Sequence, residues 1–119
     1  MAVAKNILIS AGGTGGHFFP ALALAKSLRA NGKNVILTTD KRCKSYIPDD
    51  ALDMIVVQNV KRFRKRPIAL MLFSFTLLYY VWSNLALMRN KHIDVVLTFG
   101  GYQGIAVLLA AYILRIPII

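Results

Sequence analysis

The 119-residue chain is poor in acidic side chains and in residues that bind metals. It contains no glutamate, and all five of its carboxylates are aspartates. This composition excludes most chemistry that needs several carboxylates, such as a two-carboxylate glycosidase or a calcium-binding loop. The single cysteine, Cys43, excludes an internal disulfide framework and a CxxC site for metal or redox chemistry. With only two histidines beside that cysteine, we do not expect a zinc site.

The abundant residues are basic and apolar. Lysine and arginine number 15 against 5 acids, which gives a formal net charge of +10, and 56% of the residues are hydrophobic. The apolar content excludes a disordered chain, and the length is that of one domain. Such a chain suits a partner that is itself apolar and anionic. A membrane surface or a lipid phosphate meets that description better than DNA does.

Short apolar runs alternate with helical patterns along the chain. Continuous apolar strands separated by helices imply a parallel sheet covered on both faces, so we predict an α/β fold with a Rossmann-like sheet. Asn31-Gly32 is expected to end the first helix. A fifth apolar run starts at Ile116 and then the chain stops, so we expect a truncated chain. We predict strands at Asn6–Ser10, Asn34–Thr39, Met54–Gln58 and Asp94–Phe99, helices at Phe18–Ala30, Ile68–Asn90 and Tyr102–Leu114, and a short turn or helix at Lys41–Tyr46.

A glycine-rich segment, AGGTGGH at residues 11–17, joins the first predicted strand to the first helix. Glycines at such a turn let backbone N–H groups converge on a phosphate or diphosphate, and the positive end of the helix adds to the attraction. The spacing is not that of a dinucleotide fold, because Phe18 stands where GxGxxG needs its last glycine. It is not Walker A either, since no Gly-Lys-Ser/Thr follows. A purely structural turn is the alternative.

The two histidines differ in their surroundings. His17 follows the last glycine, where a histidine could accept a proton from a hydroxyl nucleophile; capping the helix or donating to a phosphate are its other roles. His92 follows the long helix, and we expect it at the surface or at the helix end, with no catalytic role. Because carboxylates are scarce, His17 is the only credible base in the glycine loop.

A basic run precedes the longest apolar segment. Pro67–Met88 holds 22 residues without a charge, enough by length to cross a bilayer as a helix. Its polar residues recur on one side, which favours an amphipathic helix that packs on a sheet or lies in an interface over a true span. The basic run could equally be a solvated loop. Because an apolar helix with aromatic residues follows it, the basic run and the helix together are also suited to binding an anionic membrane leaflet. The polar side comprises Thr76, Tyr79, Tyr80, Ser83 and Asn84, and the expected membrane contacts are Lys61, Arg62, Arg64, Lys65, Arg66, Phe75 and Trp82.

Two motifs resemble a known family. Residues 12–25, GGTGGHFFPALALA, resemble the first glycine loop of the MurG family and, more broadly, the N-terminal domain of glycosyltransferase family 28. Those enzymes add N-acetylglucosamine to the lipid-linked muramyl-pentapeptide of bacterial peptidoglycan synthesis. Phe99–Tyr102, followed by AVLLAAYILRIPII, is similar to the second glycine loop of the family and the helix and strand after it. The two motifs cover both ends of the chain, and the middle matches only in pattern.

The resemblance implies a GT-B enzyme, in which two Rossmann-like domains enclose a cleft. Residues 1–119 would be the acceptor-binding N-terminal domain, and the C-terminal domain that holds most of the UDP-sugar would be absent. The implied reaction is attack by the muramyl 4-hydroxyl on the anomeric carbon with inversion and release of UDP, with His17 as general base or oxyanion-side donor and no metal or other cofactor. The implied contacts are Gly12, Gly13, Thr14, Gly15 and Gly16 for UDP-N-acetylglucosamine and diphosphate, and Gly100, Gly101 and Tyr102 for the acceptor.

The resemblance also implies partners and a location. The partners are UDP-N-acetylglucosamine, undecaprenyl-diphosphate-linked muramyl-pentapeptide, an anionic membrane surface and the missing C-terminal domain. The location is peripheral, on the cytoplasmic face of the bacterial inner membrane. Nucleic acid is not expected, because the aromatic residues are not interleaved with the basic ones. The chain departs from the family at Gln103-Gly104-Ile105, where a small hydroxyl residue and a proline are usual.

Two other interpretations stay open. In the first, the chain is a stand-alone subunit, anchored by Pro67–Met88, that recruits a separate catalytic chain. In the second, it is a decayed gene product without function. Under the family interpretation we expect no transferase activity from the 119 residues alone.

Overall fold

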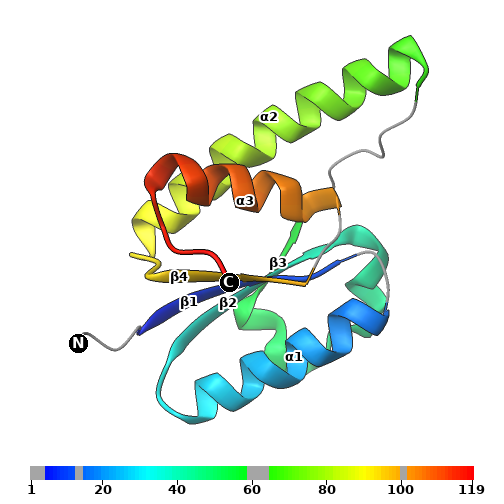
Figure 1. Ribbon diagram of the computed structural model, residues 1–119. Helices are drawn as coiled ribbons and strands as arrows, with labels where there is room; N and C mark the ends of the chain where they lie inside the picture. Colours follow the sequence, from blue (N-terminus) through cyan, green and yellow to red (C-terminus); the bar gives the residue numbers. More distant parts are fainter. Residues whose placement is uncertain (1–4, 13–14, 59–64, 100–101) are drawn as a thin grey trace.

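The computed structural model describes residues 5–12, 15–58, 65–99 and 102–119. They form a four-stranded, all-parallel sheet in the order β3-β2-β1-β4, with helices on both faces (Figure 1). The predicted α/β, Rossmann-like fold is therefore confirmed. The elements are β1 (Asn6–Ser10), α1 (Gly15–Ala30), β2 (Asn34–Asp40), the 3-10 helices η1 (Lys41–Tyr46) and η2 (Asp49–Met54), β3 (Ile55–Gln58), α2 (Pro67–Asn90), β4 (Val95–Thr98) and α3 (Tyr102–Leu114).

The central strand β1 is buried on both faces, and successive residues point to opposite layers. Ile7 and Ile9 belong to the core that includes Phe18 of α1, whereas Leu8 belongs to the core formed with α2 and α3. Helix α1 thus covers one face of the sheet, while α2 and α3 cover the other (Figure 1). A strand covered on both faces needs an unbroken apolar sequence, which is why NILIS predicted a buried strand.

Several predicted boundaries were wrong. Helix α1 begins at Gly15 rather than Phe18, because the glycines of its first turn have low helix propensity and hide the start in the sequence. The 3-10 helix η2 occupies Asp49–Met54, so β3 begins at Ile55. Of the predicted fifth strand the structure shows one parallel bridge, Val96 with Ile118.

Each of the helices α1, α2 and α3 is followed by a left-handed residue, which after α3 is Arg115 with φ +57°. Gly32 has φ +82° and lies after the last residue of α1, which confirms Asn31-Gly32 as its end. His92 has φ +53° and follows α2, where the N–H of Ile93 donates to the carbonyl of Met88 at 3.0 Å. His92 is exposed at the helix end, as predicted.

Helix α2 is the longest element, with 24 residues, and its buried residues, Asn84 and Met88, lie in its C-terminal half. Its N-terminal half projects past α3 and the sheet, at the end of the molecule where α1 and α3 begin (Figure 1). By length and composition α2 could cross a membrane, and 6% of its most apolar 18-residue stretch is buried. The apolar content of α2 is therefore not explained by packing within the described residues.

Helix α2 buries polar as well as apolar residues, since Met88 lies in the core with Leu85 and Leu87 packed against it. Asn84 is buried and Thr76 and Tyr80 are half-buried, so much of the predicted polar side faces the domain. Phe75 and Trp82 are 65% and 76% exposed. Tyr79, which we predicted on the polar side, is exposed with the apolar residues.

Candidate functional site

Both glycine segments follow neighbouring strands of the sheet. The N–H of Ala11, directly after β1, donates to the carbonyl of Thr38 at 2.9 Å. The N–H of Phe99, directly after β4, donates to the carbonyl of Ser10 at 2.7 Å. Because β1 and β4 are parallel and adjacent, the two segments start side by side at the carboxyl edge of the sheet. Ligands of open α/β sheets bind at this edge, where connections leave to opposite faces.

The first segment leads into the start of α1. Gly12 is buried, Gly15 and Gly16 open the helix, and His17 is exposed in its first turn. No acidic residue lies in that turn, so its free N–H groups and the helix dipole favour an anion. An exposed imidazole beside them can accept a proton or donate to a phosphate oxygen.

The predicted site is only partly within the described residues. The structure brings Gly12, Gly15, Gly16 and His17 together at the carboxyl edge, and Tyr102 begins α3 at the same edge. The predicted contacts Gly13, Thr14, Gly100 and Gly101 lie outside the described residues.

Sequence reasoning missed a buried polar layer at this edge. Gln58, the last residue of β3, and Asn84 of α2 exchange two side-chain hydrogen bonds, with Nε2 of Gln58 donating at 2.6 Å and Nδ2 of Asn84 donating at 3.2 Å. The sequence feature that could have indicated this layer is the polar residue at the end of each strand, which is unusual beside an apolar core. The buried polar residues of the described chain are Ser10, Thr38, Thr39, Asp40, Gln58 and Asn84.

Ion pairs and carboxylate hydrogen bonds lie mostly away from the carboxyl edge. Asp94 accepts hydrogen bonds from the N–H of Asn6 at 2.9 Å and of Lys5 at 3.0 Å, which hold the pKa of its carboxyl below the usual value. Hydrogen bonds from Arg29 likewise lower the pKa of Asp53. These groups tie elements together and serve the fold.

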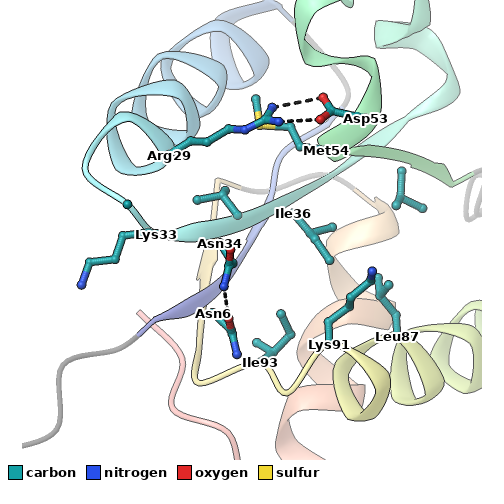
Figure 2. Close-up of a pocket in the computed structure, with 13 residues that line it drawn as sticks. Asn6, Arg29, Lys33, Asn34, Ile36, Asp53, Met54, Leu87, Lys91 and Ile93 are labelled. Carbon is teal, nitrogen blue, oxygen red and sulfur yellow. Dashed lines mark hydrogen bonds and ion pairs between the residues drawn. The ribbon is translucent and has the colours of Figure 1, made fainter.

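An open cavity of about 600 Å³ lies at the amino edge of the sheet (Figure 2). The Arg29–Asp53 pair lines one side, and Asn34 donates to Asn6 at 2.9 Å on another. Lys91 lines it from the segment after α2. Since the glycine segments lie at the opposite edge, this cavity is separate from the candidate site.

The proposed membrane contacts are partly described. Lys65 and Arg66 are exposed immediately before α2, and Phe75 and Trp82 are exposed along it. Lys61, Arg62 and Arg64 lie outside the described residues. Within the described ranges no three His, Cys, Asp or Glu side chains come together as metal ligands.

A parallel sheet with two glycine segments that follow the carboxyl ends of the adjacent strands β1 and β4 defines a Rossmann-like class of domain. The chain belongs to a family within that class, the glycosyltransferase family 28 N-terminal domain, whose profile matches residues 7–119. The family named on the two glycine motifs is therefore confirmed.

Curated relatives agree with this membership. The chain is 44% identical over 115 residues to the UDP-N-acetylglucosamine--N-acetylmuramyl-(pentapeptide) pyrophosphoryl-undecaprenol N-acetylglucosamine transferase of Rickettsia prowazekii, covering 97% of this chain and 29% of that protein. It is 42% identical to the protein of the same name from Rickettsia rickettsii, with 30% of that protein covered. The chain thus spans less than a third of the length of these relatives.

Solved structures show the same fold. The crystal structure of Acinetobacter baumannii MurG matches with a TM-score of 0.77 and 31% identity, over 96% of this chain and 34% of that one. UDP-GlcNAc 2-epimerase from Methanocaldococcus jannaschii matches with a TM-score of 0.66 at 14% identity, which shows a shared fold alone.

Proposed function

We propose that this chain is the acceptor-binding domain of a transferase that passes N-acetylglucosamine from UDP-N-acetylglucosamine to a lipid-linked muramyl-pentapeptide in peptidoglycan synthesis. The observation that carries the proposal is the pair of glycine segments at adjacent strand ends, in a chain 44% identical to a transferase named for that reaction. The C-terminal donor domain comes from sequence beyond the 119 residues, as the greater length of the relatives supports.

The proposed reaction gives a role to His17 and to each of the two glycine segments. The muramyl 4-hydroxyl attacks the anomeric carbon, a C–O bond forms with inversion, and the bond to UDP breaks with its electron pair leaving on the diphosphate. His17, exposed at the start of α1, accepts the hydroxyl proton. The N–H groups of the glycine segment and of the first turn of α1 stabilise diphosphate charge. Gly100, Gly101 and Tyr102 contact the acceptor.

Helix α2 is the proposed contact with an anionic membrane. Its exposed side is apolar, and Lys65 and Arg66 lie at its start. The hydroxyls of Ser74 and Thr76 donate to carbonyls of Leu70 and Leu72 at 2.9 and 2.7 Å, so they are satisfied within the helix. The N-terminal half of α2 lies at the end of the molecule where α1 and α3 begin (Figure 1). A peripheral enzyme that contacts the cytoplasmic membrane face through this half would therefore hold its site near the lipid diphosphate.

The catalytic role is tested in a chimera that joins residues 1–119 to the remaining sequence of the Rickettsia prowazekii relative. His17→Ala should lower kcat by roughly 10²–10⁴-fold, the usual loss for a general base. His92→Ala, at an exposed helix end, is the matched control and should keep activity. Equal activity of the His17 variant and the parent chimera would remove His17 from the mechanism. Turnover by the purified 119 residues alone would contradict the need for a donor domain.

The membrane contact is tested by co-sedimentation with vesicles of phosphatidylglycerol and phosphatidylcholine. Lys65→Glu with Arg66→Glu should weaken binding by roughly tenfold or more, at about 1 kcal/mol per basic residue near the surface. Lys41→Glu with Lys44→Glu, on η1, makes the same charge change away from α2 and should have less effect. If both double variants lose vesicle binding equally, the chain is attracted by its net charge and α2 makes no specific contact.

A second candidate is the stand-alone, membrane-anchored subunit. The observation that favours it is the length and exposure of α2, which is apolar enough to cross a bilayer. Extraction of native membranes separates the two: peripheral protein leaves at alkaline pH, whereas a spanning helix stays.

A further inference from the structure

Helix α3 begins unusually close to the sheet at Gly104. A Cβ built on Gly104 would lie 3.3 Å from Oγ of Ser10 and 3.6 Å from Oγ1 of Thr98. Ser10 is the last residue of β1 and Thr98 the last of β4, and the two are register partners. Gly104 is itself buried. The first turn of α3 therefore rests directly on the carboxyl ends of the two strands that lead into the glycine segments.

A row of hydroxyl side chains forms the surface beneath it. Thr98, Ser10 and Thr38 are register partners across three adjacent strands. Ser10 and Thr38 have no exposed surface, and all three take part in interactions. The preceding residues on the same face, Leu8 and Val96, are apolar core. On this face, polar residues replace apolar ones at the last positions of β1 and β4 and at their register partner Thr38, which lies two residues before the end of β2.

The close approach sets where α3 starts relative to the ends of β1 and β4. The first leaves β1 one residue after Ser10, and the second joins Thr98 to the start of α3. Any shift of α3 away from the sheet moves the end of the second segment while the first stays with β1. We propose that Gly104, Ser10 and Thr98 form a positioning seat that fixes the start of α3, and thereby the acceptor-side glycine segment, at the height that the transfer reaction needs.

The proposal rests on the proposed function for its catalytic consequence, but its structural part does not depend on it. At 3.3 Å the oxygen of Ser10 is close enough that an added methyl group requires a shift of a few tenths of an ångström. Interiors are close-packed, so the strain passes to the helix or to the serine. Misplacement by 1 Å can cost about 100-fold in rate, so we expect a loss of about tenfold in kcat/KM from this smaller shift.

The structural part is tested by amide hydrogen exchange of the 119-residue chain. Gly104→Ala and Gly104→Val should speed exchange at residues 102–106 and also at residues 11–12 and 15–17, while the amino edge at Asn34–Val35 stays unchanged. Leu109→Phe adds bulk on the outer side of α3 and is the control. The proposal would be overturned if the Gly104 variants sped amide exchange only within α3, or if Leu109→Phe sped exchange at the same residues as they do.

The catalytic part uses the chimera described above. Gly104→Ala should raise KM for the lipid-linked acceptor about tenfold with a smaller change in kcat. Adding Ser10→Ala removes the oxygen that the new methyl group meets, so the double variant should return to within about twofold of Ser10→Ala alone. Failure of Ser10→Ala to rescue Gly104→Ala would overturn the proposal. If exchange responds as expected and the parent chimera transfers no sugar, the seat stands and the proposed function fails.

Discussion

The buried pair of Gln58 and Asn84 makes a quantitative prediction about what holds α2 to the sheet. Asn84→Leu removes both hydrogen bonds and leaves the amide of Gln58, which is 2% exposed, without that partner. A buried polar group left unsatisfied costs about 1–3 kcal/mol of the free energy of unfolding. For a domain of this length a loss of about 2 kcal/mol lowers Tm by roughly 6–12 °C.

Replacing both partners should recover most of that loss. Gln58→Met with Asn84→Leu leaves no orphaned amide, and paired polar groups exchanged for apolar ones of similar shape are often neutral. The double-mutant cycle should therefore show a coupling energy of about 1–2 kcal/mol. Such a result would mean that the pair specifies the register of α2 more than it adds stability.

Urea unfolding of the purified chain, followed by far-UV circular dichroism, measures Asn84→Leu, Gln58→Met and the double variant. Ser74→Ala, on an exposed part of α2, is the control and should change the free energy of unfolding by less than about 0.5 kcal/mol. The reasoning is refuted if Asn84→Leu is as stable as the parent. It is also refuted if the double variant loses more free energy of unfolding than the two single variants lose together.

Three further predictions concern the domain as a whole. Phe18→Ala empties a fully buried ring position and should cost about 3–5 kcal/mol in urea unfolding. Gly32→Ala places a Cβ at φ +82° and should cost about 1–2 kcal/mol, although the space around it is open. The pKa of Asp94 is lowered in the folded chain, so the unfolded chain takes up that proton first and stability falls as pH drops below about 4. Asp94→Asn should flatten this fall, measured as urea midpoints between about pH 5 and pH 2; an unchanged slope would assign it to other carboxylates.

The fold was largely predictable because the strands are buried on both faces. NILIS and NVILTT cannot be amphipathic, and their unbroken apolar runs separate clearly from the helices between them. The start of α1 at Gly15 and the 3-10 helix at Asp49–Met54 were not predictable, because glycine and aspartate have low helix propensity and tertiary contacts decide their conformation.

The candidate site was predictable only where local sequence determines it. The glycine segments and His17 can be recognised from the local sequence, and the pairing of β1 with β4 brings the starts of the two segments together. The seat at Gly104 joins residues 10, 98 and 104, and nothing local to Ser10 points to a partner 94 positions away. The direction in which α2 turns its polar side was equally hidden, because it depends on Gln58 at the end of β3.

The position of β1 in the centre of the sheet has a consequence for synthesis on the ribosome. Its second neighbour, β4, pairs with it from almost 90 residues later, and Asp94 reaches back to Lys5 and Asn6. At roughly 5–20 residues per second, β4 emerges about 2–8 s after β3 is made. During that interval β1 has an open edge, and α2 is synthesised before its packing partner α3. The apolar helix α2 is therefore exposed to its surroundings before the domain that carries it can close.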